Sequence, residues 1–178
     1  MPLLLVMGSW MPKALAQVIP DSTLAPETSQ INQTNNQIVI EGGAQRGAAL
    51  FHSFETFGVS QGSAVSFVSP PKTEIIIGRI TGNGASLIDG TLGVLGPADL
   101  FLLNPNGILL GPDAQLSLSG DFTASTAESV RINELNFSAA LPASVPSLNI
   151  SVEPGLQLGA NSPERLVQNQ GNLVLSNQ

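Results

Sequence analysis

A dense succession of short apolar runs between residues 73 and 129 constrains this chain most. The runs EIIIGRI, SLIDGTLGVL, DLFLLNP, GILLGP, AQLSLSG and DFTAST follow one another with barely room to turn. Glycine, proline and asparagine separate them, and these residues favour turns. A helical crossover needs about a dozen residues or more, and no gap is that long. These segments are therefore predicted to be short strands of an all-β fold.

Two glycines add a repeat to this pattern. Gly90 and Gly111 both follow apolar pairs, in LIDG and ILLG, and lie 21 residues apart. This spacing is near the length of one coil of a parallel β-solenoid, in which short strands stack on the coil below. Solenoid corners need glycine, asparagine and proline, the residues that separate the runs here. The pattern therefore favours a solenoid.

The segments on either side differ from this region. Residues 18–37 are polar and contain Pro20 and Pro26, which block a helix, so they are interpreted as an extended lead-in before the strand QIVIEGG. Strands are also favoured in ALFHSFETFGVSQGSAVSFV, although its first three phenylalanines are three residues apart. Residues 128–148 are interpreted as an excursion from the coil. NISVEPGLQLG and GNLVLSNQ are expected to return to strands.

Residues 1–16 are predicted to be a signal peptide. They contain a short apolar core and end in Ala14-Leu15-Ala16, the small-x-small pattern that signal peptidase accepts. No basic residue precedes the apolar core, and Lys13 follows it; an upstream start codon is one explanation. The alternatives are a strand or a membrane anchor, but a helix that crosses a bilayer needs roughly 20 apolar residues. We therefore expect export.

Composition narrows the choice of partners. The chain has 6 Lys and Arg against 13 Asp and Glu, and no basic run follows a phosphate backbone, so nucleic acid is a poor partner. The chain contains 0 Cys, which removes disulfides, thiol nucleophiles and cysteine-rich metal sites. Hydrophobic residues make up 42% and charged residues 11%, which disfavours disorder of the whole chain.

The sharpest turn signal lies in LFLLNPNGILLGP. Asn-Pro-Asn-Gly places proline at the second turn position and glycine at the fourth, and the first asparagine, Asn104, can cap the turn with its side chain. These are type I preferences. Taken alone, the tetrapeptide predicts a tight solenoid corner and carries little information about function.

The order of the motifs resembles the N-terminal domain of filamentous haemagglutinin, the secretion domain of two-partner exoproteins. LFLLNPNGI, GPDAQL and GDFTAST carry the resemblance, in that order. It extends upstream through QVIPDSTL, GGAQRGAALFHSFETFGV and GRITGNGASLIDGTL, and downstream through PGLQLGA. It assigns residues 17–168 to the secretion domain, and residues 169–178 to the start of a further, truncated β-helix coil.

The resemblance implies a right-handed parallel β-helix with N-terminal capping strands. It further implies an adhesin- or haemagglutinin-like exoprotein, secreted or held at the cell surface of a Gram-negative-type bacterium. Its partner would be an outer-membrane β-barrel transporter whose periplasmic POTRA-type domains recognise the secretion domain. Export would then initiate β-helix folding. The apolar strand before the turn is suited to pair with an exposed sheet edge of that partner.

In this family, Asn104, Pro105, Asn106 and Gly107 correspond to a transporter-recognition or turn motif. A second Asn-Pro-Asn motif, usually upstream of GRITG, is not intact, because the segment 69–72 reads SPPK. That segment keeps a proline-led turn but loses both asparagines. The resemblance therefore gives it no clear recognition role.

No catalytic, metal or cofactor site is predicted, and the protein is expected not to be an enzyme. His52 is the single histidine, so a catalytic triad would need it together with Ser53 and Glu55 or Asp89. A histidine packed among the apolar residues of LFHSFETF requires fewer assumptions and is favoured. The acids of the repeat region are interpreted as solvated corner residues, without the spacing of a calcium loop. They are Asp89, Asp99, Asp113 and Asp121.

An alternative function is a carbohydrate-binding adhesion module that binds host or cell-surface glycans. Solenoid faces can bind sugars, and the family name refers to red-cell agglutination. The sequence contains 0 Tyr, and its one Trp is Trp10 in the signal segment. This lack of aromatic platforms argues against stacking on sugar rings.

Overall fold

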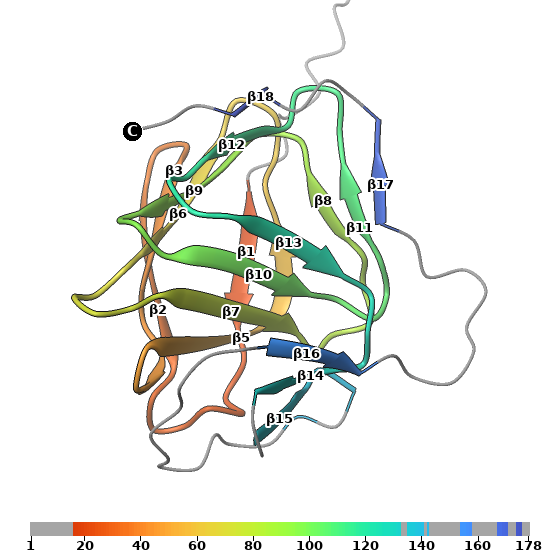
Figure 1. Cartoon of the computed structure of the whole chain (residues 1–178). Helices are drawn as coiled ribbons and strands as arrows, with labels where there is room; N and C mark the ends of the chain where they lie inside the picture. The colour runs from red at the N-terminus through yellow and green to blue at the C-terminus, as the bar shows by residue number, and fades with distance from the viewer. Residues whose placement is uncertain are drawn as a thin grey trace, which may run out of the picture.

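The chain winds through successive coils, whose strands stack in three parallel sheets (Figure 1). The computed structural model describes residues 16–132, 135–140, 142, 154–157, 167–170 and 174–175. In this part of the chain all regular elements are strands, so the all-β prediction is confirmed. No described helix is long and apolar enough to cross a membrane.

Three sheets, here named A, B and C, form the walls of the solenoid. The parallel strands of sheet A are β5 (Ala49–Gly58), β7 (Ile75–Ile80), β10 (Asp99–Leu103) and β13 (Phe122–Ser125). Sheet B contains β3 (Gln37–Gly42), β6 (Ala64–Val68), β9 (Thr91–Leu95), β12 (Gln115–Ser117) and β18 (Val174–Leu175). Sheet C contains β8 (Ser86–Ile88), β11 (Ile108–Leu110) and β17 (Val167–Asn169). The solenoid prediction is therefore confirmed.

The strand register fixes the coil length. Ile76 pairs with Leu100 in sheet A, a step of 24 residues, whereas Ser86 pairs with Ile108 in sheet C, a step of 22. The predicted spacing of 21 is therefore slightly short. The turn after β11 is longer than the turn after β8, so Gly90 and Gly111 occupy different places in their turns and do not stack on each other. Their spacing in the sequence is therefore shorter than the coil length.

Inward-facing apolar rows fill the solenoid. In sheet B, one such row runs through Ile38, Val65, Leu92 and Leu116, which are paired in register across four strands and are all buried. Phe54 and Phe57 lie in the same core, whereas Phe51 lies in a second apolar cluster outside the solenoid. The phenylalanine-rich segment is strand β5, as predicted.

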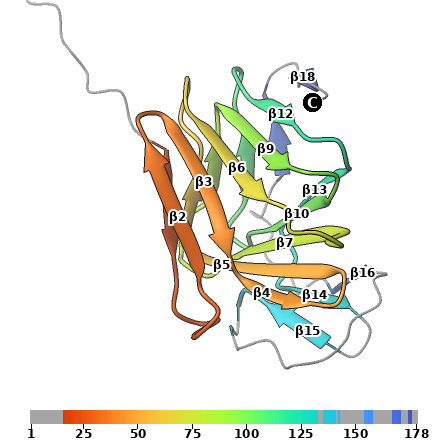
Figure 2. The same ribbon diagram turned by 90° about the vertical axis from the view of Figure 1, so that its left-hand side faces the viewer.

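The N-terminal lead-in caps the first coil. β1 (Gln17–Pro20) and β4 (Ala44–Arg46) run antiparallel to β5, and β2 (Ser29–Thr34) runs antiparallel to β3. Figure 2 shows β2 and β3 at the left-hand edge of the molecule, with the later strands of sheet B following beside them. These antiparallel strands are the predicted capping strands.

The predicted excursion forms a separate sheet, named sheet D. Its strands are β14 (Ser129–Ile132), β15 (Leu135–Ser138) and β16 (Pro154–Gln157), all paired antiparallel (Figure 1). The run at β16 was expected to return to the coil, but it pairs with β14 instead. The chain rejoins the solenoid at β17 and β18, on β11 and β12. Residues 1–15 lie outside the described part, so the signal peptide and domain bounds stay predictions.

Candidate functional site

The candidate site is the corner between β10 and β11, where the Asn-Pro-Asn-Gly turn lies. The backbone nitrogen of Gly107 donates to the carbonyl oxygen of Asn104 at 3.1 Å, and the nitrogen of Asn106 donates to Oδ1 of Asn104 at 2.9 Å. These two bonds close the turn and cap it with a side chain. Gly107 has φ +115°, a conformation that favours glycine. The turn prediction is confirmed.

The asparagines of this turn also bind the preceding coil. Nδ2 of Asn104 donates to the carbonyl oxygen of Gly84 and to Oγ of Ser86, each at 3.0 Å. Nδ2 of Asn106 donates to the carbonyl oxygen of Gly82 at 2.7 Å. Both side chains therefore bridge one coil corner to the coil below, in addition to shaping their own turn.

Burial limits what this corner presents to a partner. Asn104 is 0% exposed and Pro105 is buried, whereas Asn106 is exposed. The preceding strand, β10, is paired with β7 on one side and β13 on the other. In the folded chain β10 therefore has no free edge, and the predicted pairing of this strand with a partner sheet can apply only before sheet A forms.

The segment SPPK occupies a different corner, between β6 and β7. The backbone nitrogen of Thr73 donates to the carbonyl oxygen of Pro70 at 3.1 Å, which closes a turn, and Lys72 has φ +70°. Pro71 and Lys72 are exposed. The proline-led turn is therefore present, but its outer residues make no asparagine bridge to a neighbouring coil.

A buried arginine on sheet A was missed by the sequence analysis. Arg79 is 1% exposed, and its Nε donates to Oγ of Ser53 at 2.8 Å, its Nη2 to Oγ1 of Thr23 at 2.7 Å, and its Nη1 to the carbonyl oxygen of Ser138 at 2.9 Å. The guanidinium carbon lies 4.1 Å from the ring centroid of Phe137, a cation–π contact. A lone charge inside the apolar strand IIIGRI, residues 75–80, was the available signal.

Asp21 supplies the negative charge of this cluster. Its carboxylate accepts hydrogen bonds from Ser53 Oγ at 2.7 Å and Thr81 Oγ1 at 2.6 Å, and also from Thr23. Burial opposes ionisation of Asp21, but the hydrogen bonds from Thr23, Thr81 and Ser53 outweigh it and lower its pKa. Burial lowers the pKa of Arg79 to about 10, although the charge of Asp21 acts to raise it. The guanidinium therefore stays protonated at neutral pH.

His52 is a packed histidine, as the sequence analysis favoured. It is 0% exposed, its Nδ1 lies 2.9 Å from Oγ of Ser29, and its ring contacts Phe54 and Phe67. Burial lowers its pKa to about 3, so the imidazole is neutral at physiological pH. Successive strand residues point to opposite faces, and Ser53 lies in the Arg79 cluster outside the solenoid. His52 and Ser53 therefore cannot form a catalytic pair.

The acids of the repeat region lie at corners and cap the next coil. Oδ1 of Asp89 accepts a bond from the backbone nitrogen of Asp113 at 3.1 Å, and Oδ1 of Asp99 accepts one from the nitrogen of Asp121 at 2.7 Å. Among the described residues, no group of three or more His, Asp or Glu is placed to hold a metal ion. The carboxylates of Asp89 and Asp99 thus act as corner caps.

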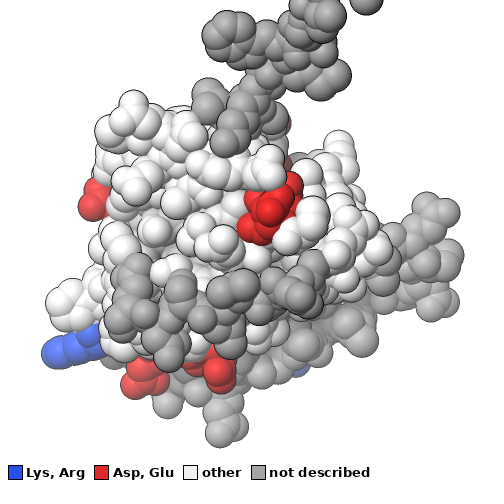
Figure 3. All heavy atoms as spheres, turned by 90° about the horizontal axis from the view of Figure 1, so that it is seen from above, with Lys and Arg blue, Asp and Glu red and all other residues white. Residues whose placement is uncertain are grey.

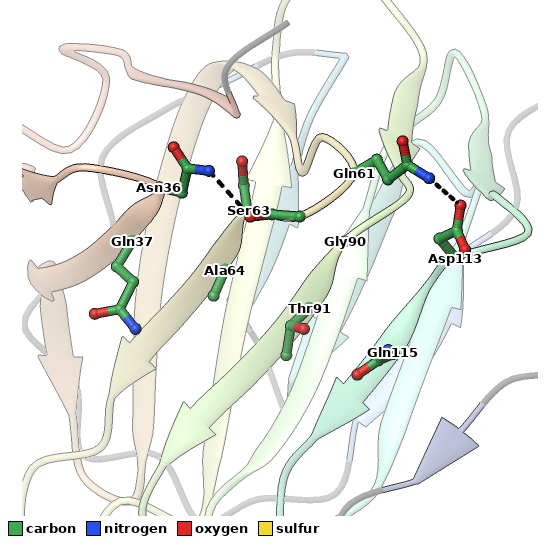
Figure 4. Close-up of a pocket in the computed structure, with 10 residues that line it drawn as sticks. Asn36, Gln37, Gln61, Ser63, Ala64, Gly90, Thr91, Asp113 and Gln115 are labelled. Carbon is green, nitrogen blue, oxygen red and sulfur yellow. Dashed lines mark hydrogen bonds between the residues drawn. The ribbon is translucent and has the colours of Figure 1, made fainter. Parts of the chain in front are cut away.

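A shallow pocket of about 440 Å³ crosses the start of sheet B (Figure 4). Gln37, Ala64, Thr91 and Gln115 lie in one row across four paired strands and form its floor. Two hydrogen bonds connect its rim, from Asn36 Nδ2 to the carbonyl oxygen of Gly62 and from Gln61 Nε2 to Asp113 Oδ2. Its lining is rich in carboxamides and contains one carboxylate and no Lys or Arg.

The surface around this end of the molecule is largely uncharged. Figure 3 shows Asp and Glu in small separate groups, with most of the visible described surface formed by other residues. On this face the described Lys and Arg residues form no broad basic patch.

The described chain is thus a capped β-solenoid in which Asn104 and Asn106 bridge one corner to the preceding coil. Residues 16–177 match the family model of the TPS secretion domain, which covers most of the chain. The chain therefore belongs to the two-partner-secretion family, as the N-terminal secretion domain of such an exoprotein. Membership implies an outer-membrane transporter as partner and a secreted or surface location.

Two relatives accompany this match. The chain is 29% identical over 122 residues to a heme/hemopexin-binding protein of Haemophilus influenzae, covering 68% of this chain and 13% of that protein. It also resembles the crystal structure of the HMW1 secretion domain from Haemophilus influenzae, with a TM-score of 0.48 and 27% identity over 63% of this chain and 27% of that chain.

Proposed function

We propose that periplasmic POTRA-type domains of an outer-membrane β-barrel transporter bind this domain, and that export then initiates β-helix folding at the cell surface. The family match carries this proposal. The fold supports it, because each new coil stacks on a finished one and the N-terminal end is capped. A chain emerging from a pore can therefore fold progressively from that end. The domain acts in secretion without catalysing a reaction.

Within this proposal, Asn104, Pro105, Asn106 and Gly107 serve as a turn that the transporter recognises. Burial separates the two asparagines. Asn106 is exposed and available to a partner of the folded turn, whereas Asn104 is enclosed and available only before the corner folds. The two residues therefore distinguish recognition of a folded turn from recognition of an extended segment.

Secretion of residues 17–178 behind a working signal peptide tests the proposal, in cells with and without the candidate transporter. Transporter-dependent appearance in the medium is expected. Asn106→Ala removes the exposed bond to Gly82 and a long bond, 3.4 Å, to Oδ1 of Asn104, and is expected to cost less than about 1 kcal/mol of stability. Asn104→Ala is expected to cost roughly 1–3 kcal/mol. Secretion without the transporter at the same level would refute the proposal.

Ser86→Ala provides the matched control for the turn. It removes a partner of Asn104 on the neighbouring coil and leaves the motif intact. If the transporter recognises the folded turn, Asn106→Ala lowers secretion more than Ser86→Ala does, although Ser86→Ala removes a buried hydrogen-bond partner and is expected to be the less stable protein. If secretion simply follows stability across the three variants, the turn acts only as a structural corner.

A neutral glycan is a second proposed partner, supported by the pocket on sheet B. Carboxamides both donate and accept, so Gln37, Gln61 and Gln115 suit vicinal hydroxyl groups, and the absence of Lys and Arg from the lining disfavours anionic sugars. The lining has no aromatic ring, so binding would be weak. Titration with maltohexaose, followed by NMR, tests it: Gln115→Ala should reduce the shifts and Gln30→Ala, on β2, should not.

A further inference from the structure

We infer that Arg79 couples two segments that are far apart in sequence, so that they dock together on the outer face of sheet A. One is the leading segment, residues 17–24, and the other is the excursion hairpin, β14 and β15. Arg79 is the positioning residue for both. This inference is independent of the transporter and of any glycan.

The guanidinium divides its hydrogen bonds between these segments. Nη2 donates to Thr23 in the leading segment, Nη1 donates to the carbonyl oxygen of Ser138 in the hairpin, and Nε donates to Ser53 on sheet A itself. The ring of Phe137, also in the hairpin, covers the planar face of the guanidinium. Each segment therefore completes one part of the arginine's surroundings.

Ser53 extends the cluster to Asp21. Its Oγ lies 2.8 Å from Nε of Arg79 and 2.7 Å from Oδ2 of Asp21, so it lies between the two charged groups. Thr81, two residues after Arg79 on the same coil, also donates to Asp21. The leading segment thus supplies the negative charge that balances Arg79, and the hairpin supplies the aromatic ring that covers it.

A buried charge makes this arrangement cooperative. Transfer of a guanidinium from water to a protein interior is unfavourable unless hydrogen bonds and an opposite charge compensate it. If the hairpin docks alone, Arg79 is covered without Thr23 and Asp21. If the leading segment docks alone, the carbonyl of Ser138 and the ring of Phe137 are missing. Either half-assembled state is therefore disfavoured.

Apolar packing at the same face strengthens the coupling. Leu24 of the leading segment and Val130 and Phe137 of the hairpin belong to one buried cluster with Phe51 and Ile77 of sheet A. Phe51 and Phe137 pack edge to face, with ring centroids 4.9 Å apart. The two segments therefore share one apolar surface as well as one guanidinium.

Native-state hydrogen exchange tests the coupling in the chain 17–178. Asp21→Asn weakens the leading segment at its own end of the cluster, and amides of β1 and β15 report the two segments. We expect protection to fall in both strands by a similar factor, roughly 2- to 100-fold, the range of coupling energies between residues of one network. Amides of β9 on sheet B are the reference and should keep their protection.

Two further variants give the design its controls. Glu27→Gln removes an acid that pairs with Arg46 at the surface, and it should leave β15 unchanged. In an Arg79→Met background, Asp21→Asn should affect β1 alone, because the connection is gone. If Arg79→Met does not fold, Phe137→Leu supplies the reverse measurement, since coupling is reciprocal and must lower the protection of β1.

Three outcomes would overturn the inference. The first is a loss of protection in β1 with β15 unchanged in the Asp21→Asn protein. The second is an equal loss in β9, which would show a global change of stability. The third is unchanged protection of β1 in the Phe137→Leu protein.

Discussion

Sheets A and B present the same kind of surface to the solenoid core and opposite kinds to the outside. Their inward rows are dominated by buried aliphatic and aromatic residues. On the outer face of sheet A, Phe51, Ile77 and Phe101 form one register row and lie under sheet D. On the outer face of sheet B, the corresponding rows carry small, polar or half-buried residues, such as Ser66 and Gly93.

This difference shows that inward and outward rows have separate tasks. The inward rows allow coils to stack, and either sheet would satisfy that need. The outward rows decide what covers a sheet: a large apolar row requires a second layer, here the leading segment and the excursion hairpin. The excursion therefore does more than interrupt the repeat, because it covers the outward apolar residues of sheet A.

The largest test exchanges one outward residue on each sheet for lysine. Ile77→Lys places a charge inside the second apolar cluster, where Ile77 is 0% exposed, and is expected to cost more than about 3 kcal/mol of unfolding free energy. Ser66→Lys, on the open face of sheet B, is expected to change it by less than about 0.5 kcal/mol. Urea denaturation measures both.

Equal losses in the two lysine variants would contradict the comparison. They would mean that the outer face of sheet B is covered as well. A small loss in Ile77→Lys would instead mean that sheet D leaves sheet A readily.

A second, smaller effect concerns the one titratable group in the inward rows of sheet A. The pKa of His52 is lowered from 6.5 to about 3 by burial, so the unfolded chain binds more protons between these values. The contribution of neutral His52 to the free energy of unfolding is therefore fully present above pH 6.5. It is lost as the pH decreases towards 3, by up to about 1.4 kcal/mol per pH unit. Sheet B has no such residue in its inward rows.

Urea denaturation between pH 7.5 and 4.5 measures this dependence, and His52→Leu should flatten it. The contribution of Asp21 lies outside this window. Its folded pKa is lowered from 3.8, so its stabilisation is present above that value and is lost only at lower pH. An equally steep pH dependence in the His52→Leu protein would assign the effect to other groups.

The sequence predicted the coil and its sharpest corner because both depend on local chemistry. Short apolar runs and turn residues specify strands, and Asn104 closes its own turn whatever surrounds it. It did not predict the role of Arg79, whose partners lie 56 and 59 residues away, at Thr23 and Ser138. Nor did it place β16 in sheet D, because a short apolar run pairs equally well with a coil or with an excursion.

The smallest effect on the free energy of unfolding is expected on the outer face of sheet B. A Cβ at Gly93 would lie 2.6 Å from the carbonyl oxygen of Ser117 on the next coil, so Gly93→Ala must push these two coils apart slightly. We expect a loss of roughly 1–2 kcal/mol, typical of overpacking. Ser66→Ala, in the neighbouring strand of the same row, should be near neutral in the same urea denaturation. An unaffected Gly93→Ala protein would mean that sheet B, unlike the doubly covered sheet A, adjusts its coil spacing freely.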